Sequence, residues 1–288
     1  MRQFDDDDRI DRRSLEKLIE VHLAEGAVGF LVAAQAGEVH WLTVDERLEL
    51  LRTVRAQTLG RAIVIAGATA RDREVTLRVA REAVALGCDG VLAEPPPNAE
   101  PDAIREFFRT VARIGVPMLM IQDLDWHGSG MPIKLIVELF EEIDVFRSLK
   151  IEVATAGPKY SEVLAATGGR LHVSGGWAAL QMIEALDRGV DVFMNTALTR
   201  WYRRIFDAHG AGQRAHAVEC FHKILPVLSF TRQHLDVSIH FHKRLFEHRG
   251  IFRTARCRTR GMAYDSYHER CGLELMAYLD RLDSAETQ

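Results

Sequence analysis

FRSLKIEVATAGPKY, residues 146–160, is the stretch that decides how this chain folds. It opens with a mostly apolar run at 146–151, which is typical of a buried strand, and a Gly-Pro turn follows at Gly157. A charged lysine, Lys150, stands near the end of the apolar run, and Glu152 comes two residues later. Because an unpaired ammonium group is unstable away from water, this lysine must either pair with an anion or give up its proton.

Similar apolar runs recur along the first two thirds of the chain, at intervals of roughly 20–35 residues, the length of a strand plus a returning helix. The predicted strands are residues 27–33, 62–67, 90–94, 117–122, 146–151, 170–174 and 190–195. Helix signals lie between them: Thr43 and Glu46 form a capping box, and glycines end several predicted helices, at Gly26, Gly87, Gly115 and Gly189. Alternating strands and helices, with strands apolar enough for burial on both faces, indicate a parallel sheet.

We therefore predict an α/β fold, a (β/α)8 TIM barrel over residues 1–200, followed by a C-terminal helical extension over residues 201–288 that packs on the barrel. The candidate for the eighth strand is Met1–Phe4, which is short, as if the start were truncated there. In the extension, Ser266 and Glu269 are predicted to cap the final helix. An open doubly wound sheet is the alternative architecture, although no G-x-G-x-x-G motif follows the early strands.

Composition excludes several function classes. The 288 residues are 47% hydrophobic and 27% charged, with a formal net charge of −4 and no dense basic block, so we expect no nucleic-acid partner. No apolar stretch approaches the ~20 residues that cross a bilayer, and no apolar leader opens the chain, which predicts a soluble, cytoplasmic protein without membrane contact. The four cysteines show no C-x-x-C spacing, so we predict neither disulfides nor a metal site, and no cofactor.

The lysine suggests carbonyl chemistry. The C-terminal ends of barrel strands form the active-site face, so Lys150 is predicted to point into the barrel mouth. A desolvated lysine amine is a nucleophile toward carbonyl groups, which predicts a Schiff base with an oxo acid. The structural alternative is a salt bridge from Lys150 to Glu152 or Glu94, or a side chain that reaches the barrel rim.

The order of several short motifs resembles the dihydrodipicolinate synthase and N-acetylneuraminate lyase family of class I aldolases, over nearly the whole chain. Residues 34–38 occupy the place of the family's G-T-T-G-E loop, and residues 148–150 that of its G-I-K, whose lysine forms the Schiff base. The other matching segments are 64–67, 87–90, 95–97, 174–176 and 189–191. The resemblance implies a (β/α)8 barrel, a Schiff base at Lys150 and a homo-oligomer, either a tetramer or a dimer.

The chain departs from the family at the groups that move protons. The family's catalytic tyrosine should fall near Ile121, and its two loop threonines are replaced by Gln35 and Ala36. The arginine that often follows the fifth strand is also missing. Other groups must therefore take over proton transfer, and Glu152 is our catalytic candidate beside Lys150, because residues two apart on a strand face the same side. Further acid–base candidates are Glu38, Asp123, His40 and His127.

The residues expected to bind the substrate are Gln35, Ala36, Gly37, Gln122, Asp123, Gly175 and Met194. Backbone N–H groups at Ala36 and Gly37 suit a substrate carboxylate, and Gln35, Gln122 and Trp41 suit a hydroxylated one. We predict a Schiff-base lyase, an aldolase or dehydratase, acting on a 2-oxo acid such as pyruvate or a keto-deoxy sugar acid. The alternative is a catalytically impaired barrel that binds a small acid or a protein partner.

Overall fold

The computed structural model describes residues 4–5, 7–176, 180–259 and 261–285. The chain divides into two compact units, one containing Val28–Ala34 and Leu42–Asn195, the other containing Met1–Ala27, Gln35–Trp41 and Thr196–Gln288. The first unit carries the sheet and the second is helical. No helix within the described ranges is both long enough and apolar enough to cross a membrane.

The sheet unit is built from parallel strands that follow one another in chain order, β1-β2-β3-β4-β5-β6-β7. The strands are β1 (Gly29–Val32), β2 (Ile63–Gly67), β3 (Gly90–Ala93), β4 (Leu119–Asp125), β5 (Phe146–Val153), β6 (His172–Gly175) and β7 (Val192–Phe193). Each of the seven predicted strands is confirmed, although β4 runs three residues further than predicted. Sequential parallel strands joined by helices are the arrangement of a (β/α)8 barrel, which confirms the predicted fold class over the open sheet.

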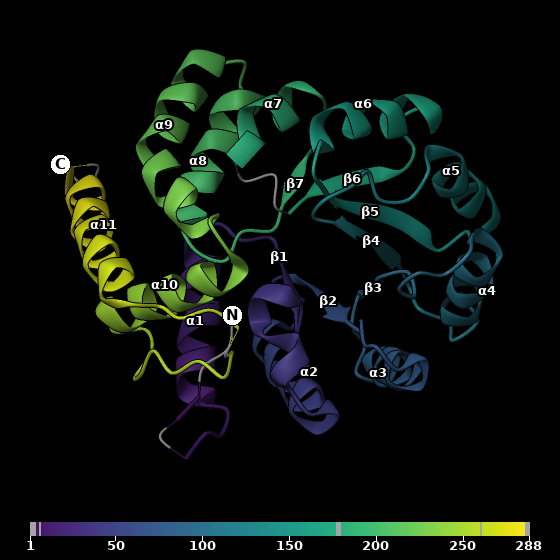
Figure 1. The fold of residues 1–288 in the computed structure, drawn as a ribbon, viewed down its shortest axis with the longest axis horizontal. Coiled ribbons are helices and arrows are strands. Elements are labelled where there is room, and N and C mark those ends of the chain that lie inside the picture. The colour runs from purple at the N-terminus through teal and green to yellow at the C-terminus, as the bar shows by residue number, and fades with distance from the viewer. Residues whose placement is uncertain (1–3, 6, 177–179, 260, 286–288) are drawn as a thin grey trace. The chain divides into compact units, whose positions relative to one another are not determined.

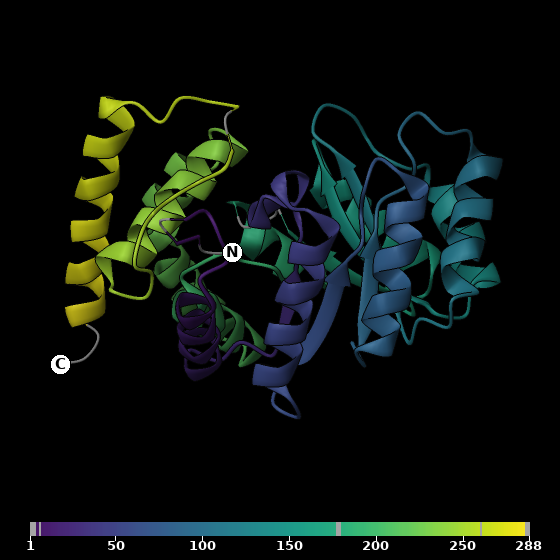
Figure 2. The ribbon, with the colours of Figure 1, turned by 90° about the horizontal axis from the view of Figure 1, so that it is seen from below.

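Helices cover the outer face of the sheet, as Figures 1 and 2 show for α2 to α6. The helices of this unit are α2 (Val44–Thr58), α3 (Arg73–Ala85), α4 (Pro101–Ala112), α5 (Ile133–Glu142), α6 (Ala156–Ala166) and α7 (Met182–Asp187). Helix α2 begins with the predicted capping box, in which the Thr43 hydroxyl accepts from the Glu46 N–H and the Glu46 carboxylate accepts from the Thr43 N–H.

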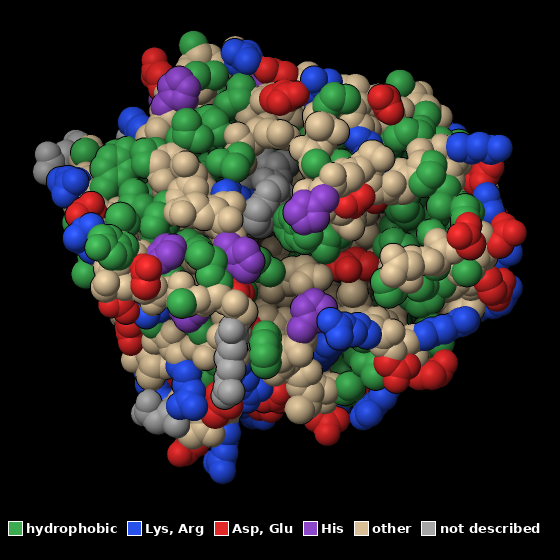
Figure 3. Space-filling view, in the orientation of Figure 1, with side chains coloured by type: hydrophobic (Ala, Val, Ile, Leu, Met, Phe, Trp, Pro, Cys, Tyr) green, Lys and Arg blue, Asp and Glu red, His purple; other side chains and the backbone are tan. Residues whose placement is uncertain are grey.

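One face of the sheet carries an apolar cluster. Ile65, Leu92 and Met120 are buried together, and Leu31, Met118 and Met194 pack against them. The outer surface of α4 and α5 is charged instead of apolar. Arg105 on α4 pairs with Glu138 on α5, and Arg109 pairs with Glu142. Figure 3 shows basic and acidic side chains interspersed along this edge. The outer face of these two helices is therefore a solvent face.

The helical unit contains α1 (Arg12–Ala24), the short 3-10 turns η1 (Gln35–Gly37) and η2 (Val39–Trp41), and α8 (Thr199–Gly210), α9 (Arg214–Thr231), α10 (Leu235–His248) and α11 (Ser266–Ala285). Helix α9 contacts α8, α10 and α11. The predicted C-terminal helical extension is therefore present. The predicted division at residue 200 stays a prediction, as does its packing on the barrel.

The final helix is capped by Asp265 rather than Ser266, since the Asp265 Oδ1 atom accepts the N–H groups of Tyr267 and His268, each at 3.0 Å. The prediction of Ser266 as the cap was therefore wrong by one residue. Of the candidate eighth strand, Met1–Phe4, residues 1–3 lie outside the described residues, and Phe4 forms an isolated antiparallel bridge with Ile10.

Candidate active site

Strand β5 brings Lys150 and Glu152 together on one face of the sheet. Their side chains are two positions apart, so both leave the strand on the same side, as predicted. Lys150 is 6% exposed and Glu152 is 7% exposed. The Lys150 Nζ atom lies 2.9 Å from the Glu152 Oε2 atom. The strand therefore accommodates an ammonium group by supplying the anion itself.

Neighbouring strands add polar side chains beside this pair. Gln122 on β4 and Ser174 on β6 are the register partners of Lys150, so the three side chains leave the sheet on the same face. The Gln122 Nε2 atom donates a hydrogen bond to the same Oε2 atom of Glu152 that Lys150 contacts. Met120 precedes Gln122 by two residues, so this polar row continues the face that carries the apolar cluster.

Gly176 closes the site at the end of β6. A methyl group on its Cα would overlap the Glu152 Oε1 atom and the Lys150 Cε atom. Only glycine fits at this position without displacing both side chains. The glycine at the end of the Ser-Gly-Gly segment, residues 174–176, is therefore required for steric reasons, because the backbone at Gly176 lies against the Lys150 and Glu152 side chains.

Hydrogen-bond counts separate Lys150 from the other buried lysines. Lys159 donates to the backbone carbonyls of Met131 and Ser129 and pairs with the Asp123 carboxylate, which uses all three of its N–H groups. Lys150 has one acceptor, Glu152, among the described residues. A lysine whose donors are all used is held as a cation, whereas Lys150 has N–H groups that no other residue within the described ranges accepts. Within the part of the chain that the structure describes, this difference sets Lys150 apart from Lys159.

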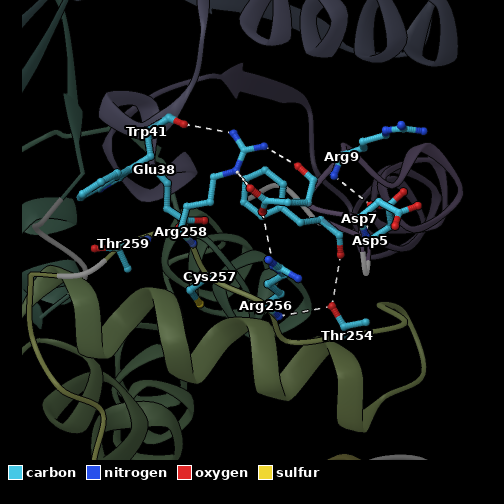
Figure 4. A network of polar contacts seen from close by, with 12 residues as sticks. Asp5, Asp7, Arg9, Glu38, Trp41, Thr254, Arg256, Cys257, Arg258 and Thr259 are labelled. Carbon is cyan, nitrogen blue, oxygen red and sulfur yellow. Dashed lines mark hydrogen bonds and ion pairs between the residues drawn. The ribbon is translucent and has the colours of Figure 1, made fainter.

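The third buried lysine, Lys243 on α10, belongs to the helical unit and is also saturated. Its Nζ atom lies 2.5 Å from the Glu38 Oε2 atom, 2.6 Å from the Arg256 carbonyl oxygen and 4.9 Å from the centre of the Phe4 ring. The other Glu38 oxygen accepts the N–H groups of Arg258 and Thr259, at 2.7 and 2.9 Å, in the network of Figure 4. Glu38, an acid–base candidate from sequence, therefore serves as a structural anion here.

Asp123 turns away from Lys150. It is the next residue after Gln122 on β4 and so leaves the sheet on the opposite face. Its carboxylate pairs with Lys159 and accepts the Met131 N–H at 2.8 Å. Burial raises the pKa of Asp123, while the charge of Lys159 acts in the opposite direction. The structure thus joins Asp123 to Lys159 instead of to the Lys150 group.

The loop after β4, where the family tyrosine segment was expected, is fixed by polar bonds. The Asp125 carboxylate accepts N–H groups from His127, Gly128 and Gly130, at 3.2, 2.9 and 3.1 Å. The hydrogen bond from the Gly130 N–H is the main cause that lowers the pKa of Asp125. His127, another acid–base candidate, is exposed on this loop.

The remaining predicted site residues lie in several places. Gly175 lies on β6 and its carbonyl oxygen accepts the Met194 N–H at 3.3 Å, while the Met194 side chain packs on the apolar cluster of the sheet. Gln35, Ala36 and Gly37 form the turn η1 in the helical unit, where the Gln35 Oε1 atom lies 3.0 Å from the His40 Nε2 atom. Their predicted role toward the substrate stays a prediction.

Sequence reasoning missed two buried residues on α6, namely Lys159, which pairs with Asp123, and Tyr160, which lies within reach of the Glu152 charge. Tyr160 is fully buried, and its hydroxyl has no hydrogen-bond partner within the described part of the chain. Burial raises the pKa of Tyr160, and the negative charge of Glu152 raises it further. No sequence signal marked either residue, because a Lys-Tyr pair in a helix is ordinary until the fold brings it beside a buried carboxylate.

Comparison with known proteins supplies a family context. The family model described as "Dihydrodipicolinate synthetase family" matches residues 1–266. A 4-hydroxy-tetrahydrodipicolinate synthase of Oceanobacillus iheyensis is 26% identical over 231 residues, 78% of this chain and 77% of that protein. An uncharacterized DapA-like lyase of Rhizobium meliloti is 29% identical over 150 residues, 51% of this chain and 50% of that protein.

Solved structures agree on the fold. The crystal structure of dihydrodipicolinate synthase from Rhodopseudomonas palustris superimposes with a TM-score of 0.87 at 22% identity, covering 96% of this chain and 94% of that one. A monomeric dihydrodipicolinate synthase variant also gives a TM-score of 0.87, at 15% identity, covering 97% of this chain and 94% of that one. At these identities the similarity shows the barrel fold alone.

Proposed function

Because this chain belongs to the dihydrodipicolinate synthetase family, we propose that it is a lyase that forms a Schiff base between Lys150 and a 2-oxo acid. Pyruvate and keto-deoxy sugar acids are the substrate types that fit this chemistry. The observation that carries the proposal is the incomplete hydrogen bonding of a buried lysine: Lys150 has one acceptor among the described residues, whereas Lys159 has three.

The reaction begins with a proton transfer inside the pair on β5. Glu152 lies 2.9 Å from the Lys150 Nζ atom and is placed to receive the ammonium proton. The neutral amine then attacks the carbonyl carbon of the acid, and a carbon–nitrogen bond forms while the carbonyl oxygen takes up a proton. That oxygen takes up a second proton and leaves as water, and the protonated imine remains. Removal of a proton from the adjacent carbon gives the enamine.

Glu152 is the group we assign to these proton transfers. The family's tyrosine is absent near Ile121, and the buried Gln122 amide holds the Glu152 carboxylate beside the amine. A carboxylate fixed in this way can accept a proton from Lys150 and return one to the leaving oxygen. Positioned acid–base groups of this kind contribute about 10²–10⁴-fold to a rate.

Reductive trapping tests the proposal. The protein is incubated with pyruvate and, in parallel, with longer 2-oxo acids, reduced with borohydride and digested, and the modified peptide is identified by mass spectrometry. We expect a reduced adduct on Lys150 and none on Lys159. Lys150→Met should give no adduct, whereas Lys134→Met, which removes an exposed lysine of α5, should label like the unmodified protein. Absence of label at Lys150 with every acid would contradict the proposal.

A binding barrel without turnover is the second candidate, because Ile121, Gln35 and Ala36 replace three hydroxyl groups of the family pattern. It predicts that a small acid raises the melting temperature without being consumed. It also predicts equal stabilisation of Lys150→Ala, whereas the lyase predicts that this variant loses the stabilisation.

We also propose a homo-oligomer, a dimer or a tetramer, and a cytoplasmic location, as the family relationship suggests. Light scattering of the purified protein at several concentrations tests the assembly. A single mass of one chain across that range would contradict it.

A further inference from the structure

Two buried polar atoms beside Lys150 have no hydrogen-bond partner among the residues that the structure describes: the Gln122 Oε1 atom and the Ser174 Oγ atom. Both residues are 0% exposed, and both are register partners of Lys150, one on β4 and one on β6. Buried polar atoms are nearly always bonded, so two such atoms flanking a reactive amine point to a ligand group that is missing from this structure.

The orientation of the Gln122 amide follows from its neighbour. The Glu152 Oε2 atom receives hydrogen bonds from both Gln122 and Lys150. An ionised carboxylate only accepts, so the amide nitrogen must face it and the amide oxygen must point elsewhere. That oxygen is itself only an acceptor. Its missing partner is therefore a donor, which a substrate carboxylate or carbonyl oxygen cannot supply and a hydroxyl group can.

The amide is also close to the atoms that react. Gln122 and Lys150 share one oxygen of Glu152, and their strands are adjacent, at a spacing of about 4.8 Å. In the imine the carbonyl oxygen has already left as water, so the carbon joined to the Lys150 Nζ atom keeps two carbon neighbours, the carboxylate carbon and carbon 3. The carboxylate would repel the amide oxygen. A hydroxyl on carbon 3 would donate to it, and Ser174 offers a hydroxyl that can either donate or accept on the opposite side of Lys150.

We propose that Gln122 and Ser174 select 2-oxo acids that carry a hydroxyl group on carbon 3, next to the carbonyl carbon. The inference rests on the proposed function, because the amine of Lys150 fixes where that carbon lies. It goes further than the function by naming the chemical class of the substrate and the two residues that recognise it.

A matched pair of acids tests the inference. Pyruvate and 3-hydroxypyruvate differ by a single hydroxyl on carbon 3, so borohydride trapping is titrated with each, and the concentration that gives half-maximal label at Lys150 is measured. We expect this concentration to be at least about tenfold lower for 3-hydroxypyruvate, since a buried acceptor left without a donor weakens binding by about that factor. In Gln122→Met the ratio between the two acids should fall close to one.

Ser174→Ala should reduce the ratio, and Gln213→Met, which changes an exposed glutamine, should leave it as in the unmodified protein. Melting curves of all variants exclude unfolding as the cause. Equal half-maximal concentrations in the unmodified protein overturn the inference and leave the Schiff base intact. A Gln122→Met variant that weakens both acids equally also overturns it, because the amide would then only hold Glu152. Absence of label with both acids removes the proposed function itself.

Discussion

Lys159→Met would test how strongly the second buried lysine holds the sheet unit. In the structure Lys159 is 6% exposed, Asp123 is 1% exposed, and the lysine also donates to the carbonyls of Met131 and Ser129. Methionine has a similar length but no charge, so the Asp123 carboxylate would be buried without its counter-ion. Breaking a buried ion pair from one side destabilises a protein by about 3–5 kcal/mol. For a protein of this size class that corresponds to a fall in melting temperature of roughly 6–20 °C.

The assay is thermal unfolding followed by circular dichroism, with two further variants. Lys134→Met removes an exposed lysine whose side chain is 88% exposed, so it should change stability by no more than about 0.5 kcal/mol. The double change Lys159→Met with Asp123→Asn should recover much of the loss, because no buried charge is left. A melting temperature for Lys159→Met that matches the Lys134→Met control would refute the reasoning.

The pH dependence gives an independent check on Lys159→Met. Burial raises the pKa of Asp123 and Lys159 opposes that rise, so the variant should raise the pKa of Asp123 further. A carboxyl group whose pKa is raised in the folded state contributes stability at pH values below its pKa in the unfolded state. That stability is lost as the pH rises through its pKa in the folded state. The deficit of Lys159→Met should therefore become smaller as the pH is lowered from neutral toward the ordinary pKa range of an aspartate carboxyl group. A deficit independent of pH would mean that the Asp123 charge is not its cause.

Three further predictions concern the site and the helical unit. After long incubation Glu152→Gln should still reach the reduced pyruvate adduct at Lys150, because trapping at equilibrium does not need fast proton transfer. Exchange of the pyruvate methyl protons in D₂O, followed by NMR, should slow about 10²–10⁴-fold, and unchanged exchange would remove Glu152 from the mechanism. Gly176→Ala should lose most of the adduct at Lys150, because the added methyl group overlaps the Glu152 and Lys150 side chains. Gly210→Ala, which has open space around it, should give the normal adduct. Equal labelling of the two variants would contradict the steric argument. Burial lowers the pKa of His242 to about 3, so the stability that the neutral imidazole contributes is present above about pH 6.5 and is lost as the pH falls toward 3. The melting temperature of His242→Gln should therefore depend less on pH over that range. Identical pH profiles for the variant and the unmodified protein would contradict this prediction.

Much of the fold could be predicted because its signals are local. Each strand of the sheet was marked by an apolar run, and the capping box at Thr43 fixed the start of α2 by contacts within four residues. The pairing of Lys150 with Glu152 followed from the alternation of side chains along one strand. The cap at Asp265 was missed because two neighbouring residues, Asp265 and Ser266, can both accept N–H groups and only the backbone geometry chooses between them.

The sequence by itself determined the order of strands and helices and the presence of a lysine–carboxylate pair on β5, because periodicity and spacing act over a few residues. Only the tertiary structure decided that Lys159 has an acceptor for each of its three N–H groups, while Lys150 has one acceptor among the described residues. The partners of Lys159 and Gln122 come from about 30 positions away along the chain, through the registry of adjacent parallel strands and the loop after β4. Hydrogen-bond saturation depends on these distant partners, so no pattern within one segment could reveal it.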